Sequence, residues 1–173
     1  MTVEYSSTLG GALVTIGDGG TSKLDVGTVD PIYTIDGQKY ATYMAGMTGV
    51  KEETSGALVL DKQSAGLFMA KLDFQNAPLG SDIWLFGRTT NLLNNQEHFD
   101  QTSCLLTPNF AGQAWYEKDW DGRSINIFAR PDNVNRASVE VSYRLTAPRF
   151  DSEKWTNYSD SQHSGFNLDE LLK

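Results

Sequence analysis

The chain has 173 residues, of which 39% are hydrophobic and 21% are charged, a composition typical of a folded globular protein of one domain. Its formal net charge is −8, with 14 basic residues against 22 acidic ones. Because binding a phosphate backbone requires clustered lysine and arginine side chains, this balance argues against a nucleic-acid partner. No apolar run approaches the ~18 residues of a membrane-spanning helix, and we expect no membrane span.

The first part of the chain predicts a lead-in to a folded domain. It contains no basic segment followed by an apolar one, so we expect no secretion signal within this sequence. Residues 1–30 are rich in glycine, serine and threonine, and strand patterns are weak, at 12–16 and 23–26. This composition is typical of a stalk or linker.

A β-hairpin is predicted next. Asp36-Gly37 separates the apolar stretches 32–35 and 39–44. Asp-Gly between such stretches indicates a type I′ turn, because that turn needs a positive φ at both central residues. The aromatic share of 11% and the 16 glycines favour β-structure in the chain as a whole.

Strand patterns continue along the rest of the chain. Apolar and polar residues alternate over 68–74 and, most clearly, over 139–146, which predicts strands with one buried face. The run 83–86 is apolar at every position and predicts a central strand covered on both sides. Residues 91–101 are predicted to form one helical turn or a long loop. Strands at 115–118 and 124–128 bracket a second hairpin turn at 119–123.

Together these elements predict an all-β domain over residues 31–148. We expect an antiparallel β-sandwich of jelly-roll type, with a barrel as the second choice and at most a short C-terminal helix. The tail, residues 149–173, is polar up to an apolar end that could form this helix. A helix so short persists only when it docks, on its own domain or on a neighbouring subunit. The candidate assembly contacts are Phe166, Leu168, Leu171 and Leu172.

Few residues are suited to catalysis. The single cysteine, Cys104, excludes an intrachain disulfide and lies in a strand-like run, where we expect a buried, inert thiol. Of the two histidines, His98 lies in a polar segment without a motif and His163 in the polar tail. No nucleophile elbow, phosphate-binding loop or zinc motif occurs. We therefore expect no catalytic residue, no metal site and no cofactor.

The second hairpin turn carries the candidate ligand-binding residues, Asp119, Trp120 and Asp121, together with Tyr116 in the preceding strand. Alternating aspartates before a glycine resemble half of a calcium loop, but the later glutamate is missing and a hairpin turn explains them. Trp120 has two interpretations. Its ring folds back onto the sheet or packs on another chain, or it is exposed beside carboxylates and stacks on a sugar.

One phrase of the sequence resembles a known family. Residues 13–27 (Leu-Val-Thr-Ile-Gly-Asp-Gly-Gly-Thr-Ser-Lys-Leu-Asp-Val-Gly) resemble a phrase of phage tail-fibre-like and bacterial surface-fibre proteins. Residues 33–43 with 47–53 resemble the opening of the β-rich C-terminal domains of these proteins, and 141–149 the close of one. The resemblance implies a terminal piece of a longer, exported fibre on a cell surface or virion, often a trimer.

Three functions are compatible with these observations. The first is a non-catalytic interaction module of a fibre-like protein, a homo-oligomer that acts in assembly or target attachment. The second is a carbohydrate-binding module that uses the Trp120 loop to bind a surface glycan. The third is a β-barrel enzyme acting on polysaccharide or a small ligand, which would require a deep cleft with two facing carboxylates.

Overall fold

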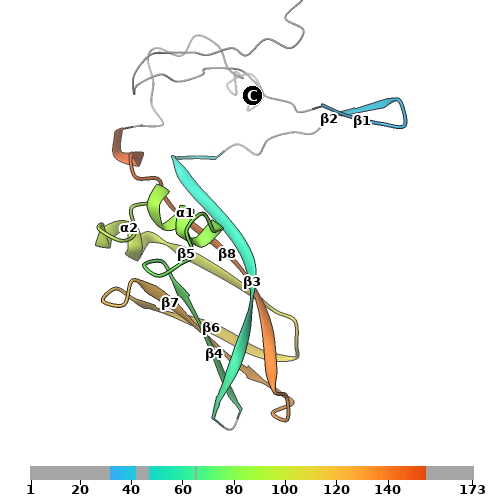
Figure 1. The fold of residues 1–173 in the computed structure, drawn as a ribbon, viewed down its shortest axis with the longest axis vertical. Coiled ribbons are helices and arrows are strands. Elements are labelled where there is room, and N and C mark those ends of the chain that lie inside the picture. Colours follow the sequence, from blue (N-terminus) through green and yellow to red (C-terminus); the bar gives the residue numbers. More distant parts are fainter. Residues whose placement is uncertain (1–31, 42–46, 65, 155–173) are drawn as a thin grey trace, which may run out of the picture. The chain divides into compact units, whose positions relative to one another are not determined.

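The structure is a computed structural model, and it describes residues 32–41, 47–64 and 66–154 (Figure 1). The chain divides into two compact units, one comprising residues 1–46 and 159–173 and the other Met47–Tyr158. The described part of the first unit is a two-stranded hairpin, and the second unit contains a six-stranded sheet. The predicted domain, residues 31–148, therefore spans parts of both units. The expected strands at 12–16 and 23–26 lie outside the described residues.

The predicted hairpin is confirmed. Strand β1 (Ile32–Ile35) pairs antiparallel with β2 (Gln38–Ala41). The two turn residues have φ values of 51° at Asp36 and 77° at Gly37, the left-handed conformation that the type I′ turn requires. Tyr33 lies opposite Tyr40, and the alternation of strand side chains places Ile35 on the same face. The exposed fractions are 58% for Tyr33, 52% for Tyr40 and 57% for Ile35.

The second unit is built on one antiparallel sheet, which confirms the predicted all-β class. Its strands follow the order β5-β8-β3-β4-β7-β6. Their bounds are β3 (Lys51–Ser64), β4 (Leu67–Asp73), β5 (Ser103–Pro108), β6 (Gly112–Asp119), β7 (Ser124–Pro131) and β8 (Ser138–Pro148). The strands predicted around 68–74 and 139–146 and the hairpin turn at 119–123 are all present. The long strand β3 was not predicted from the sequence pattern.

The long strand β3 folds this sheet into two facing layers. It pairs with β8 from Lys51 to Asp61, but with β4 only from Asp61 to its end. The layer β5-β8-β3 and the layer β4-β7-β6 therefore meet at the β3–β4 turn and separate away from it (Figure 1). The curled sheet is a nearly closed barrel, so it combines features of the two architectures that we expected.

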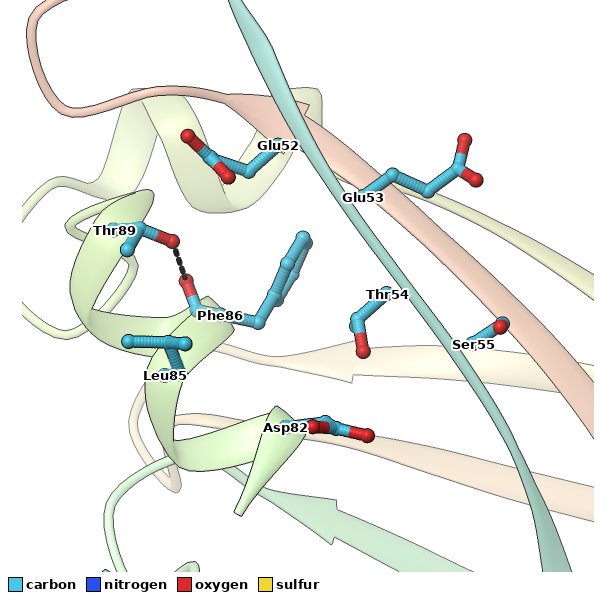
Figure 2. Close-up of a pocket in the computed structure, with 8 residues that line it drawn as sticks. All are labelled: Glu52, Glu53, Thr54, Ser55, Asp82, Leu85, Phe86 and Thr89. Carbon is cyan, nitrogen blue, oxygen red and sulfur yellow. Dashed lines mark hydrogen bonds between the residues drawn. The ribbon is translucent and has the colours of Figure 1, made fainter. Parts of the chain in front are cut away.

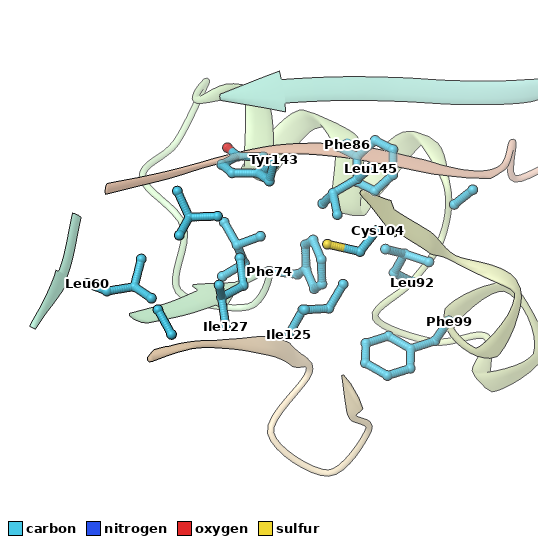
Figure 3. Packing of buried hydrophobic residues seen from close by; sticks show 14 of the residues in the cluster. Leu60, Phe74, Phe86, Leu92, Phe99, Cys104, Ile125, Ile127, Tyr143 and Leu145 are labelled. Atoms are coloured by element: carbon cyan, nitrogen blue, oxygen red, sulfur yellow. The ribbon is translucent and has the colours of Figure 1, made fainter. Parts of the chain in front are cut away.

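The core fills the space between the two layers (Figure 3). The predicted alternation in β8 is confirmed, because Val139, Val141, Tyr143 and Leu145 are buried while the residues between them are exposed or half-buried. From the opposite layer, β4 and β7 contribute Phe68, Leu72, Ile125, Ile127 and Ala129. Packing of this kind stabilises the unit by about 1.5–3 kcal/mol for each large side chain fully removed from water.

The segment between β4 and β5 is helical, which corrects two predictions. Residues 83–86 belong to helix α1 (Asp82–Thr89), not to a central strand. The hydroxyl of Ser81 caps this helix by accepting a hydrogen bond from the Trp84 amide (3.3 Å). Phe86 is buried and Leu85 is 53% exposed, so the segment is covered on one side, as a surface helix is. An apolar run of four residues is too short to show the period of a strand or of a helix. The sequence Ser81-Asp82, which is typical of the start of a helix, was the signal that distinguishes the two.

A second helix follows, and both pack on the core. Helix α2 (Gln96–Gln101) lies within the stretch predicted as a turn or loop, and it begins at Asn95, whose side chain accepts from the His98 amide (3.2 Å). Two helices inside the domain correct the expectation of at most a C-terminal helix. A short 3₁₀ helix, η1 (Ser152–Lys154), follows β8. In the described part of the chain, no helix is long and apolar enough to cross a membrane.

Candidate functional site

Three large apolar side chains form a row across the outer face of the β4-β7-β6 layer. Met69, Phe128 and Trp115 lie directly opposite one another in the three strands. Their neighbours Ala70, Ile127 and Tyr116 point into the core, so the row points outward. Each of the three is half-buried rather than buried, and none belongs to the core. We call these residues the aromatic row.

The two rings of the row stack on each other. The centroids of Trp115 and Phe128 are 5.5 Å apart and their planes differ by 16°, which is an offset stack. The guanidinium carbon of Arg130 lies 5.6 Å from the centre of the Trp115 ring, within the range of a cation–π contact. The row is thus held by its own contacts on the outer face of the sheet, where each of its side chains stays partly exposed.

Polar side chains flank the aromatic row on both sides. On one side of the row, Gln113 pairs with Arg130, each two residues along its strand from the row. On the other side, the residues two positions along the strands are Lys71, Asn126 and Glu117. Successive rows on one face of a sheet are about 6.5–7 Å apart. Among the described residues, the side chains of Gln113, Asn126 and Glu117 have no hydrogen-bond partner. Their amide and carboxylate groups can therefore meet the polar groups of a ligand on the row.

The residues predicted to bind a ligand do not form a common surface. Tyr116 points inward and packs on the core. The Asp119 carboxylate accepts a hydrogen bond from the Gly122 amide (2.9 Å), which is the turn function expected for it. Asp121 lies at a separate hollow of about 410 Å³ that it shares with Arg88 and Arg123. Within the described part of the chain, His, Cys, Asp and Glu side chains form no group of three that could hold a metal ion.

Of the two interpretations of Trp120, the structure supports the one in which the ring packs against the rest of the domain. Its ring is half-buried and contacts Phe99 edge to face, with 5.5 Å between centroids. The Arg123 guanidinium lies over the ring at 3.5 Å and also donates to the Trp120 carbonyl. Trp120 therefore joins the turn to the helical segment instead of presenting a free ring face. The rings that face outward from the domain are instead Trp115 and Phe128, in the strands beside this turn, and both are half-buried.

The register of the second hairpin could have identified the aromatic row. Once the turn is placed at 120–123, Asp119 pairs with Ser124, and counting back along both strands brings Trp115 opposite Phe128. Met69 is different, because its place in the row depends on the pairing of β4 with β7, which are far apart in the sequence. The sequence alone does not show this pairing.

A second hollow lies between β3 and α1. This cleft has a volume of about 330 Å³, and its lining includes Glu52 and Thr54 from β3 and Asp82, Leu85, Phe86 and Thr89 from α1 (Figure 2). Asp82 begins α1, and the Glu52 side chain lies toward Thr89, which ends it. An eight-residue helix is about 12 Å long, so the two carboxylates are near opposite ends of the cleft. Paired carboxylates for glycoside hydrolysis face each other at about 5–9.5 Å, and this arrangement does not match that requirement well.

Cys104 and His98 serve the core. Cys104 is buried, as predicted, and burial raises the pKa of its thiol to about 11, so it is protonated at neutral pH. His98 is buried as well, although its polar surroundings in the sequence did not predict this. Its Nδ1–H donates to the carbonyl oxygen of Thr90 (2.8 Å) and ties α2 to the end of α1. The structure thus gives both residues packing roles.

The predicted assembly contacts Phe166, Leu168, Leu171 and Leu172, and His163, lie outside the described residues. Comparison of the chain with protein-family models, with characterised proteins and with solved structures finds no match.

Proposed function

We propose that this protein is a non-catalytic interaction module that attaches to its target through the aromatic row. The observation that carries the proposal is the position of Trp115 and Phe128, which stack on the outer face of a domain whose core is already filled. Large apolar side chains gathered on an outer sheet face are typical of a binding surface. The resemblance to fibre proteins supports a place on a surface or virion fibre-like protein outside the cell.

The chemistry of the row favours a glycan as the target. Apolar C–H faces of sugars stack on aromatic rings, and their hydroxyl groups need hydrogen-bond donors and acceptors at the edge of the stack. The side chains of Gln113, Asn126 and Glu117 supply both, one row away from the rings. This interpretation keeps the predicted carbohydrate-binding activity but moves it from the Trp120 loop to the sheet face.

A glycan array with the full chain tests this proposal. We expect the wild type to bind a defined set of glycans, and Trp115→Ala to lower the affinity at least about fivefold, since a lost stacking contact costs about 1 kcal/mol or more. Trp84→Ala is the matched control, because Trp84 is also half-buried and lies 5.7 Å from an arginine, Arg88, but on α1. Near-ultraviolet circular dichroism checks that each variant is folded. The proposal is wrong if no glycan binds, or if binding survives both Trp115→Ala and Phe128→Ala.

The hairpin supports a second function, assembly of several copies of the chain. Tyr33, Ile35 and Tyr40 share one face of a two-stranded sheet, and each is more than half exposed. A two-stranded hairpin is marginally stable alone, so covering this face with another copy would stabilise it. Fibre proteins of the family that the sequence resembles are often trimers. Size-exclusion chromatography with light scattering tests this: we expect an oligomer that Tyr33→Ser with Tyr40→Ser dissociates, and a wild-type monomer at all concentrations would reject it.

A further inference from the structure

Two arginine side chains without an acidic partner share the hollow at the turn between β6 and β7. This hollow has a volume of about 410 Å³, which is the size of a small-molecule pocket. Arg88 comes from α1, and Arg123 directly precedes β7, so two distant parts of the chain bring their cations together. In the described part of the chain, neither guanidinium forms an ion pair. We call this site the arginine hollow. Its lining residues are Gln75, Arg88, Leu93, Asn94, Asp121 and Arg123.

Arg123 is held in place by the residues around it. Its Nε donates a hydrogen bond to the Leu93 carbonyl oxygen (2.9 Å), and its Nη1 donates to the Trp120 carbonyl oxygen. Its guanidinium carbon lies 3.5 Å from the centre of the Trp120 ring. The other N–H groups of this guanidinium have no partner among the described residues. A ligand in the hollow would therefore meet donors that are already ordered, which lowers the entropic cost of binding.

Arg88 adds a second cation that has no structural hydrogen bond to make. Its side chain is exposed, and its guanidinium carbon lies 5.7 Å from the centre of the Trp84 ring. No side-chain hydrogen bond joins Arg88 to another described residue. The chain as a whole has a net charge of −8, which repels anions. Two cations without acidic partners in one hollow of such a chain indicate a local preference for an anionic ligand.

Asp121, the third charged residue of the hollow, limits the charge of that ligand. Its carboxylate is exposed and forms no ion pair with either arginine. Two guanidinium groups and one carboxylate leave a single positive charge, which matches a carboxylate better than the nearly double charge of a phosphate ester. The planar fork of a guanidinium also matches the two oxygens of a carboxylate.

Most of the remaining lining suits hydroxyl groups. The side-chain amide of Gln75 has no partner among the described residues. The Asn94 side chain donates to the Asn91 side-chain oxygen (3.1 Å), which leaves its own oxygen free to accept from a ligand. Leu93 is the one apolar residue of the lining. A ligand with hydroxyl groups around its carboxylate therefore fits the hollow better than one with an aliphatic stem.

We propose that the arginine hollow binds a sugar that carries one carboxylate, such as a uronic acid residue of a glycan. The two guanidinium groups hold the carboxylate, while Gln75, Asn94 and Asp121 bind hydroxyl groups of the ring. The hollow shares no residue with the aromatic row. It is therefore a second binding site, and it does not depend on the function proposed for the row.

An NMR titration of the full, ¹⁵N-labelled chain tests this site. The probe is methyl β-D-glucuronide, and methyl β-D-glucoside has the same ring with a hydroxymethyl group in place of the carboxylate. We expect the glucuronide to shift the amides of residues 74–76, 93–95 and 121–124. The expected Kd is on the order of 1 mM, which is typical of a ligand of this size. The glucoside should leave these amides unchanged at the same concentrations.

Variants of the two arginines identify the groups that bind the carboxylate. Arg88→Gln should weaken binding of the glucuronide at least about threefold, since an ion pair to an exposed arginine has a modest effect. Arg123→Lys keeps the charge but loses the planar fork, and it should weaken binding severalfold. Arg136→Gln is the matched control, because it removes the same charge from an exposed residue between β7 and β8, outside the hollow. Trp115→Ala should leave the affinity unchanged as well, which separates this site from the aromatic row.

A further probe, Nα-acetyl-glutamate methylamide, distinguishes a sugar from an acidic side chain of a partner protein. Binding of the glucuronide severalfold more tightly than this probe supports the proposal, whereas equal or tighter binding of the glutamate probe rejects the sugar. The proposal is also overturned if the glucuronide shifts none of these amides at about ten times the expected Kd. Equal binding of the glucoside would overturn it too, as would wild-type affinity in both arginine variants once near-ultraviolet circular dichroism shows that they are folded.

Discussion

The close contact between Gly56 and Tyr143 predicts a specific loss of stability on replacing a single hydrogen atom with a methyl group. A Cβ at residue 56 would lie 2.6 Å from the Tyr143 hydroxyl oxygen and 2.9 Å from its Cζ, both well inside van der Waals contact. The two residues are directly paired across β3 and β8, so neither strand can move away without breaking the ladder. Tyr143 is buried and would have to leave its position.

The expected magnitude follows from two opposing effects. Overpacking a filled core costs about 1–3 kcal/mol. Replacing glycine with alanine also restricts the unfolded chain, which stabilises the folded state by about 0.4–1 kcal/mol. We expect Gly56→Ala to lower the free energy of unfolding by about 1–2 kcal/mol, which corresponds to a fall in melting temperature of roughly 4–8 °C for a domain of this size.

Urea unfolding monitored by circular dichroism measures this change, and a double-mutant cycle assigns its cause. Tyr143→Leu removes the atoms that the new Cβ would meet, so Gly56→Ala should cost at least about 1 kcal/mol less in the Tyr143→Leu background than in the wild type. Ser55→Ala, the outward neighbour in the same strand, should change stability by less than about 0.5 kcal/mol. Equal costs of Gly56→Ala in both backgrounds would refute the reasoning.

Three further predictions concern the interior and the second hairpin. Burial raises the pKa of Cys104 from 9.0 to about 11, so the contribution of the protonated thiol to stability is complete below pH 9 and is lost as the pH rises toward 11. Between pH 8.5 and pH 10.5, the free energy of unfolding should therefore fall less for Cys104→Ala than for the wild type. Ser124→Ala should leave stability unchanged or raise it by up to about 1 kcal/mol in urea unfolding, because the Ser124 hydroxyl is fully buried without a partner among the described residues. Arg123→Lys should lower the free energy of unfolding by about 1 kcal/mol in the same assay. The Arg123 Nε donates a hydrogen bond to the Leu93 carbonyl (2.9 Å) while the planar guanidinium covers the Trp120 ring, and a lysine side chain cannot make both contacts.

The sequence by itself determined those features that depend on neighbouring residues. The alternation over 139–146 predicted which side chains of β8 face the core, because a strand has a period of two. Asp36-Gly37 predicted a turn from the conformations that these two residues tolerate. The burial of Cys104 followed in the same way from its strand-like surroundings. Local periodicity failed at residues 83–86, where four apolar residues are too few to show whether the period is that of a strand or a helix.

Only the tertiary structure decided where the candidate sites are. The aromatic row needs Met69 beside Phe128, and the α1–β3 cleft needs Asp82 and Thr54 from two elements far apart in the chain. Pairings between distant strands depend on the packing of the whole core, and no local pattern specifies them. The same packing turned Trp120 inward and left Trp115 on the outer face, although both are tryptophans of one hairpin. Composition and spacing therefore predicted a β-rich domain, and the position of its candidate binding surfaces depended on how two layers of one sheet close over a shared core.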